Sequence, residues 1–267
     1  MSIAILAEKP SVARDIARVV AARQRGDGFL HGGGYVVTWA IGHLVALPEP
    51  HQIRPEWKRW RPELLPMIPT TWPLKVYPRT RDQFEVVSGI LNDPDVEEVV
   101  CATDAGREGE LIFRYIYEAA GCDKPIRRLW IASLTEGAIR AGLANLREGD
   151  QMKALADAAR GRSRADWLVG MNLSRAYTLK YGDTLSVGRV QTPTLAMLVE
   201  RELAIRNFVP DDYKEVHATF QPVGREETYE GVYFAPELEE KATRGRGGGG
   251  RRRRAAAHGA PAPGQRR

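Results

Sequence analysis

Acidic residues follow directly after two short apolar runs of this sequence. Glu8 comes after residues 2–7, and Asp104 and Glu108 come after residues 96–102. Ligands of a parallel sheet collect beyond the carboxyl ends of its strands, so we expect these three carboxylates to lie close together. Converging carboxylates repel one another unless a cation lies among them. Ligation by oxygen atoms alone suits Mg²⁺, so the sequence predicts a magnesium site.

Two cations flank this acidic cluster. Lys9 follows Glu8, and Arg107 precedes Glu108, so both side chains could hold a phosphate next to the metal. In the alternative interpretation, Asp104 and Glu108 only complement the dipole of a helix, and the spacing of these two acids is a weak signal by itself. The Glu-Lys-Pro and Arg-Glu-Gly-Glu contexts favour a site. The predicted catalytic residues are Glu8, Lys9, Asp104, Arg107 and Glu108, of which Glu8, Asp104 and Glu108 are the predicted metal ligands.

Strand and helix patterns alternate along the first part of the chain. Strands are predicted at 2–7, 35–47, 96–102 and 128–131, and helices at 11–22, 81–91, 110–120 and 135–146. Ser11 is the predicted N-cap of the first helix, and Gly121 is predicted to end the third. This alternation is typical of an α/β fold with a parallel sheet. The proline- and tryptophan-rich residues 48–80 are predicted to form an ordered excursion.

The pattern changes after residue 150. Helical periodicity covers 153–207, and alternating aromatic and β-branched residues at 212–234 indicate the start of a β domain. The Arg-, Gly-, Ala- and Pro-rich end cannot bury a core and is predicted to be disordered. The predicted domains are 1–150 (α/β), 151–210 (helical), 211–236 (incomplete β) and 237–267 (basic tail).

Overall charge does not indicate a nucleic-acid partner. The net charge is +5, but residues 241–267 hold nine basic and no acidic residues, so the first 240 residues carry −4. Cys101 and Cys122 lack the spacing of zinc ligands and are predicted to be reduced thiols of a cytoplasmic protein. Neither a signal peptide nor an apolar run of about 18 residues is found, so no membrane span is expected.

Four segments in order resemble type IA DNA topoisomerases, most closely their topoisomerase III branch. They are LAEKPS near the start, TWAIGHL at 38–44, ATDAGREGELIFR at 102–114 and LSVGRVQTPTLAMLVERE at 185–202. The resemblance runs from about residue 2 to about residue 235. It implies a Toprim domain, which is a Rossmann-like α/β sheet whose acids bind Mg²⁺. It also implies transient cleavage of single-stranded DNA by a tyrosine. No nucleotide cofactor is expected, and the expected location is the cytoplasm, at the nucleoid.

The resemblance also assigns roles to the predicted site. Glu8 matches the Toprim glutamate, and Lys9 matches a lysine that touches the scissile phosphate. Asp104 and Glu108 match the first and last acids of the DxDxE motif. Gly106 stands where that motif has its middle acid, so one Mg²⁺ is expected here rather than two.

In the resembling family, the helical region lines a groove for single-stranded DNA. The resemblance therefore predicts DNA-backbone contacts by Arg162, Asp166, Ser186, Arg189 and Gln191. Arginine offers forked donors to phosphate, and serine and glutamine can bond phosphates or base edges. Arg160 and Arg164 are interpreted instead as a solvated helix face.

Two residues are interpreted as decoys. Tyr77 lies in a Tyr-Pro-Arg-Thr segment that resembles the family's nucleophile motif, but this segment precedes GRVQTP, whereas the family's nucleophile follows it. His43 could order a neighbour of the acidic site, but a lone histidine after glycine is interpreted as a structural residue. Because no second such motif occurs between Arg189 and Arg267, we interpret the chain as a truncated or frame-shifted topoisomerase III without its catalytic tyrosine. The alternatives are a single-stranded DNA-binding remnant and another Toprim enzyme, such as a primase or nuclease.

Overall fold

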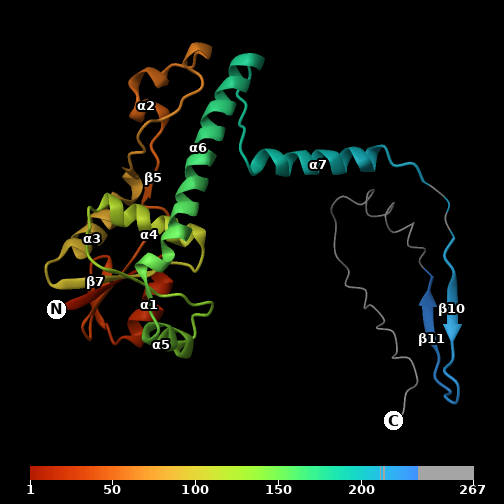
Figure 1. Cartoon of the computed structure of the whole chain (residues 1–267), viewed down its shortest axis with the longest axis horizontal. Helices are drawn as coiled ribbons and strands as arrows, with labels where there is room; N and C mark the ends of the chain where they lie inside the picture. The colour runs from red at the N-terminus through yellow and green to blue at the C-terminus, as the bar shows by residue number, and fades with distance from the viewer. Residues whose placement is uncertain (211, 213, 234–267) are drawn as a thin grey trace, which may run out of the picture. The chain divides into compact units, whose positions relative to one another are not determined.

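A computed structural model describes residues 1–210, 212 and 214–233 (Figure 1). The chain forms two compact units, Met1–Arg189 and Val190–Arg267. The predicted basic tail at 237–267 lies outside the described residues. In the part of the chain that is described, no helix combines the length and apolar character that crossing a bilayer requires.

The first unit is built on a seven-stranded sheet in the order β2-β3-β4-β1-β7-β8-β9. Its parallel centre consists of β4 (Tyr35–Trp39), β1 (Ser2–Ala7), β7 (Val96–Ala102) and β8 (Ile126–Arg128). Its edges are antiparallel and consist of β2 (Gln24–Gly26), β3 (Phe29–Gly32) and β9 (Arg147–Glu148). Ala7 is in register with Ala102, so β1 and β7 end side by side. The α/β parallel sheet is confirmed.

Helices cover both faces of this sheet (Figure 1). Alternate residues of β1 enter different cores, Ala4 and Leu6 on one face and Ile5 and Ala7 on the other. The first face packs against α3 (Arg81–Asn92) and α4 (Arg107–Ala119). The second packs against α1 (Pro10–Val19) and α5 (Glu136–Ala144). The resulting three-layer arrangement fixes the loops that leave the strand ends.

The proline-rich excursion is ordered and packs against a long helix, α6 (Lys153–Tyr181). Two short strands, β5 (Val45–Ala46) and β6 (Lys75–Val76), pair antiparallel at its base, and it includes α2 (Pro50–Ile53). The excursion also contains 3₁₀ turns at Pro55–Lys58, Pro62–Leu64 and Pro78–Thr80. A further 3₁₀ turn, Gly149–Met152, directly precedes α6. Trp57, Met67 and Trp167 form a separate small core there. The indole N–H of Trp167 donates to the Pro48 carbonyl at 2.8 Å.

The predicted helical region consists of two helices. Gly182, with φ of +80°, ends α6 in the left-handed region that glycine tolerates, and α7 (Gln191–Arg206) belongs to the second unit. In the segment where the start of a β domain is predicted, the described residues form a hairpin of β10 (His217–Phe220) and β11 (Tyr229–Val232).

Some predicted boundaries were wrong. Lys9, rather than Ser11, is the N-cap of α1, because Pro10 occupies the first helical position, where its missing N–H costs nothing. Helix α4 begins at Arg107 and not at residue 110, so Glu108 lies within its first turn. The strand predicted at 128–131 is β8 at Ile126–Arg128.

Both cysteines are buried free thiols, and burial raises the pKa of Cys101 to about 11. We expect alkylating reagents at pH 8 to leave Cys101 and Cys122 unmodified in the native protein and to modify both in urea, as read by mass spectrometry. The unfolded Cys101 thiol loses its proton at a lower pH than the folded one. Its contribution to stability is therefore present below about pH 9 and is lost as the pH rises toward 11. Rapid native labelling of Cys101 would contradict this burial.

Candidate active site at the strand ends

The ends of β1 and β7 bring Glu8, Lys9 and Asp104 together. The backbone N–H of Asp104 donates to Glu8 Oε2 at 3.1 Å. The Lys9 ammonium lies 3.3 Å from Asp104 Oδ2 and 3.8 Å from Glu8 Oε1. Its hydrogen bond with Asp104, together with the charges of Asp104 and Glu8, raises the pKa of Lys9. Two of the three predicted ligand carboxylates, those of Glu8 and Asp104, thus lie beside the Lys9 ammonium.

Glu108 faces a different partner. Its Oε1 lies 2.7 Å from Nε2 of His43, and both side chains are exposed to solvent. The sequence favours a structural role for His43, but the structure places it beside Glu108, because the loop after β4 comes beside the start of α4. Sequence reasoning missed this pair, which joins residues 65 positions apart.

The donor set fits magnesium in its chemistry, and Glu8 and Asp104 also fit in placement, because they share one cation. Glu108 does not join them in this conformation, because its carboxylate is turned to His43. Across the described residues, no three histidine, cysteine or acidic side chains stand close enough to enclose an ion. The three-ligand set therefore stays a prediction.

A buried arginine supports the loop that carries Asp104. Arg128 is fully buried, and its Nη1 donates to the carbonyls of Cys101, Thr103 and Leu129 at 2.8–2.9 Å. Its Nη2 donates to the Asp104 carbonyl at 2.7 Å.

The charge of Arg128 is balanced by an acid that sequence reasoning left without a role. Glu110 is buried, with Oε2 at 3.3 Å from Nε of Arg128 and Oε1 at 2.8 Å from Nε of Arg114. The position of Glu110 in the first turn of a helix does not by itself predict that its side chain is buried. Glu110 therefore belongs to the support of the site.

Two glycines in the loop differ in what they permit. A Cβ on Gly109 would lie 2.2 Å from the Asp104 carbonyl oxygen, and the Thr103 hydroxyl donates to the Gly109 carbonyl at 2.8 Å. Gly106 has extended backbone, with φ of −178°, and a Cβ there would meet nothing within 4 Å. The middle acid is therefore absent for no steric reason, whereas the loop requires Gly109.

A pocket of about 240 Å³ lies next to the cluster and brings several predicted residues together. Its lining includes His43, Tyr77, Arg107, Glu108, Arg162 and Asp166. Asp166 accepts from Arg189 Nη1 at 2.8 Å and lies 3.7 Å from Arg162 Nε, so one acid orients two exposed guanidinium groups. This geometry suits binding of a phosphate chain.

Other predicted residues lie around the pocket or beyond it. Tyr77 lines it with its side chain 43% exposed, which sequence reasoning did not expect. Ser186 is exposed in the segment between α6 and α7, which Ser174 and Thr178 hold through hydrogen bonds to Val187 and Leu185. Gln191 is the first residue of α7 in the second unit, so its DNA contact remains a prediction.

Known proteins share this fold and these sequence segments. A Toprim domain family model matches residues 3–134, and a DNA topoisomerase family model matches residues 150–246. The full-length topoisomerase I of Thermotoga maritima has a similar fold, with a TM-score of 0.53 and 23% identity over 90% of this chain and 37% of that one. The parallel sheet with its acidic strand ends is thus a Toprim domain.

Curated relatives give the branch. DNA topoisomerase 3 of Shouchella clausii is 51% identical over 231 residues, which are 86% of this chain and 31% of the relative. DNA topoisomerase 3 of Bacillus subtilis is 50% identical over 214 residues, which are 80% of this chain and 29% of the relative. The chain belongs to the type IA DNA topoisomerase family, in its topoisomerase III branch. It spans about 30% of the length of these relatives.

Proposed function

We propose that this chain forms the metal-binding and strand-holding part of an ATP-independent topoisomerase III. In this proposal the whole enzyme, acting on DNA in the cytoplasm, cleaves one DNA strand transiently, passes DNA through the break and rejoins it. The observation that carries the proposal is the meeting of Glu8, Lys9 and Asp104 beside a pocket that Arg107 and Arg162 line. Residues 1–150 are the Toprim domain in this proposal, and 151–210 belong to the DNA groove.

Each residue of the site has a physical role in this proposal. Glu8, Asp104 and Glu108 would hold Mg²⁺, whose charge would stabilise the negative oxygens of the phosphodiester. Lys9 and Arg107 bind and orient the scissile phosphate. The DNA backbone next to the scissile phosphate is bound by Arg162, Asp166, Ser186, Arg189 and Gln191. The ion pair of Arg189 with Asp166 keeps that guanidinium in a fixed orientation, which reduces the entropy lost on binding.

The nucleophile of this proposal is a tyrosine outside these 267 residues. Tyr77 precedes the GRVQTP segment in the chain, and no second Tyr-x-Arg-Thr follows that segment. We expect the purified chain with Mg²⁺ to leave negatively supercoiled plasmid unrelaxed. Relaxation that is lost on Tyr77→Phe would refute this assignment, because it would make Tyr77 the nucleophile.

Magnesium binding tests the metal site directly. We expect Asp104→Asn to weaken Mg²⁺ binding at least about tenfold in calorimetric titrations, because it removes one of three charged oxygen ligands. Glu97→Gln is the matched control, because it removes an exposed acid near the opposite end of β7. Equal Mg²⁺ affinity of wild type and Asp104→Asn would contradict the site.

A further inference from the structure

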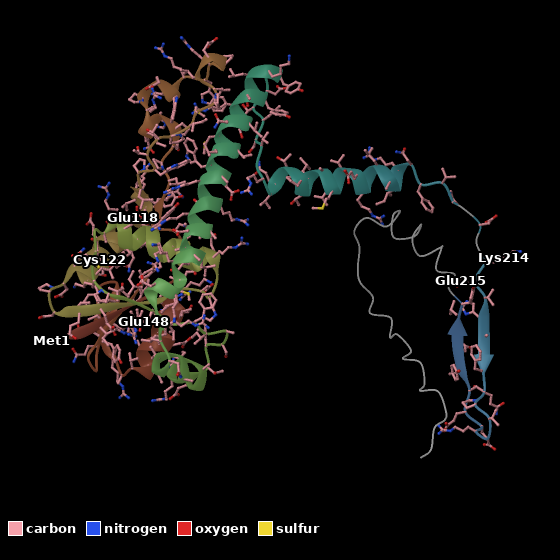
Figure 2. All side chains as sticks on the ribbon, viewed as in Figure 1. Met1, Glu118, Cys122, Glu148, Lys214 and Glu215 are labelled. Atoms are coloured by element: carbon pink, nitrogen blue, oxygen red, sulfur yellow. The ribbon has the colours of Figure 1, made fainter. Side chains whose placement is uncertain are left out.

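An exposed tryptophan stands on the excursion, away from the acidic cluster. The side chain of Trp60 is 44% exposed, although the neighbouring Trp57 is buried. Side chains of the excursion and of α6 lie against each other, as Figure 2 shows for both segments, and Trp57, Met67 and Trp167 form their shared core. A large indole exposed at the surface has no role in the core below it.

A buried arginine supports the indole from one side. The guanidinium carbon of Arg175 lies 5.1 Å from the centre of the Trp60 ring. Arg175 is 7% exposed, and its Nη1 donates to the Trp57 carbonyl at 2.6 Å and lies 3.1 Å from Met67 Sδ. Because the Trp57 carbonyl and Met67 hold the Arg175 guanidinium in place, Arg175 in turn holds one side of the Trp60 ring, while part of that ring remains exposed to solvent. A base could stack on that open part.

Basic residues flank Trp60 in the chain. Lys58, Arg59 and Arg61 are exposed and line a hollow of about 870 Å³. None of the three forms an ion pair with any residue that the structure describes. Two acids share the rim, but Glu56 is paired with Arg54 at 2.6 Å, which leaves Glu63 as the opposing charge. The rim is therefore positive and can bind phosphates.

We propose that Trp60, Lys58, Arg59 and Arg61 form a second binding site for single-stranded DNA, the Trp60 patch. A nucleobase stacks on the indole, and the flanking phosphates contact the three cations. Aromatic side chains among unpaired cations are the usual means of holding single strands without sequence preference. This inference rests on the proposed function for its choice of DNA as the nucleic acid.

The Trp60 patch is separate from the pocket that Arg162 and Asp166 line. Arg175 lies nine residues beyond Asp166 on α6, which corresponds to about 14 Å along the helix and about two and a half turns. The two residues therefore point to opposite sides of α6. A strand held by the Trp60 patch is not in the pocket at that point, so the patch holds a neighbouring part of the same strand or a second strand.

The test measures binding of fluorescently labelled oligothymidine of about 20 nucleotides by the full chain. We expect Trp60→Ala to weaken binding about tenfold, which corresponds to the loss of one stacked base, and Trp60→Phe to retain most of the affinity. We expect intrinsic tryptophan fluorescence to be quenched on binding, and much less so in Trp60→Phe. Because Trp60 also packs on Arg175, thermal melts check that both variants remain folded, and we expect the melt of Trp60→Phe to match the wild type.

A triple variant tests the cations. Lys58→Ala/Arg59→Ala/Arg61→Ala should lower the slope of log affinity against log salt by about 2, at about 0.7 per lost phosphate contact. The matched control is Arg14→Ala/Arg23→Ala/Arg25→Ala, which removes the same charge from exposed positions on α1 and at β2. Equal losses in the two triple variants would overturn the Trp60 patch, because net charge alone would then explain the binding.

Arg162→Ala/Arg189→Ala in the pocket separates this inference from the proposed function. If only the pocket variant weakens binding, the Trp60 patch is wrong and the proposed function stands. If only the patch variants weaken it, the patch is supported and the strand-holding pocket is wrong. An equal effect of Trp60→Ala on duplex DNA would overturn the single-strand assignment, since paired bases cannot stack on the indole.

Discussion

We expect Arg128→Met to lower the free energy of unfolding by about 3–5 kcal/mol, the usual cost of removing one partner of a buried ion pair. Arg128 is fully buried, and its guanidinium donates to four backbone carbonyls around the Asp104 loop. Its loss removes the guanidinium donor from those oxygens and leaves Glu110 with Arg114 as its remaining cation. Because folded domains are stable by about 5–15 kcal/mol, the loss is large, and urea denaturation measures it.

The neighbouring arginine provides the control. Arg127 pairs with Glu148 at 2.9 Å, but both side chains reach solvent, so Arg127→Ala should cost less than about 1 kcal/mol. The double variant Arg128→Met/Glu110→Leu should be more stable than Arg128→Met alone, because it removes a buried acid that has lost one of its two cations. Similar losses for Arg127→Ala and Arg128→Met would show that burial is not what makes Arg128 important.

The fold was largely predictable because its signals are local. Apolar runs at residues 2–7 and 96–102 indicate buried strands, and the structure has β1 and β7 with those bounds. Polar residues that follow such strands must meet if the strands are parallel neighbours, and Glu8 and Asp104 do meet. The order of these residues along the chain, and the rule that neighbouring parallel strands end at the same edge of the sheet, were sufficient to predict that Glu8 and Asp104 meet.

The rest depends on partners that no local pattern relates. His43 reaches Glu108, Arg128 reaches the Asp104 carbonyl, and Tyr77 lines the same pocket as Arg107. Each case depends on how the loops between elements fold, and the chemistry of one side chain does not reveal that path. The boundary at Ser11 failed for a different reason, since the fixed backbone of Pro10 starts α1 two positions earlier than the capping preference indicates.

Gly109→Ala tests whether the Asp104 loop and the metal site depend on close packing. Alanine is favoured over glycine within a helix by about 1 kcal/mol, so propensity alone predicts a more stable protein. The added Cβ, however, would lie 2.2 Å from the Asp104 carbonyl oxygen, in a backbone that Arg128 and Thr103 hold in place. Overpacking costs about 1–3 kcal/mol, so we expect a net loss of stability in thermal melts.

The same substitution should act on metal binding. Relief of the clash moves the Asp104 backbone, and with it the N–H that donates to Glu8, so we expect Mg²⁺ affinity to fall by at least about tenfold. Gly106→Ala, three residues away, is the control, because its extended backbone and open surroundings accept a Cβ without contact. Its stability should stay within about 0.5 kcal/mol of wild type. If both variants bind Mg²⁺ as the wild type does, the position of Asp104 does not control the metal, and the ligand set at the strand ends must be reassigned.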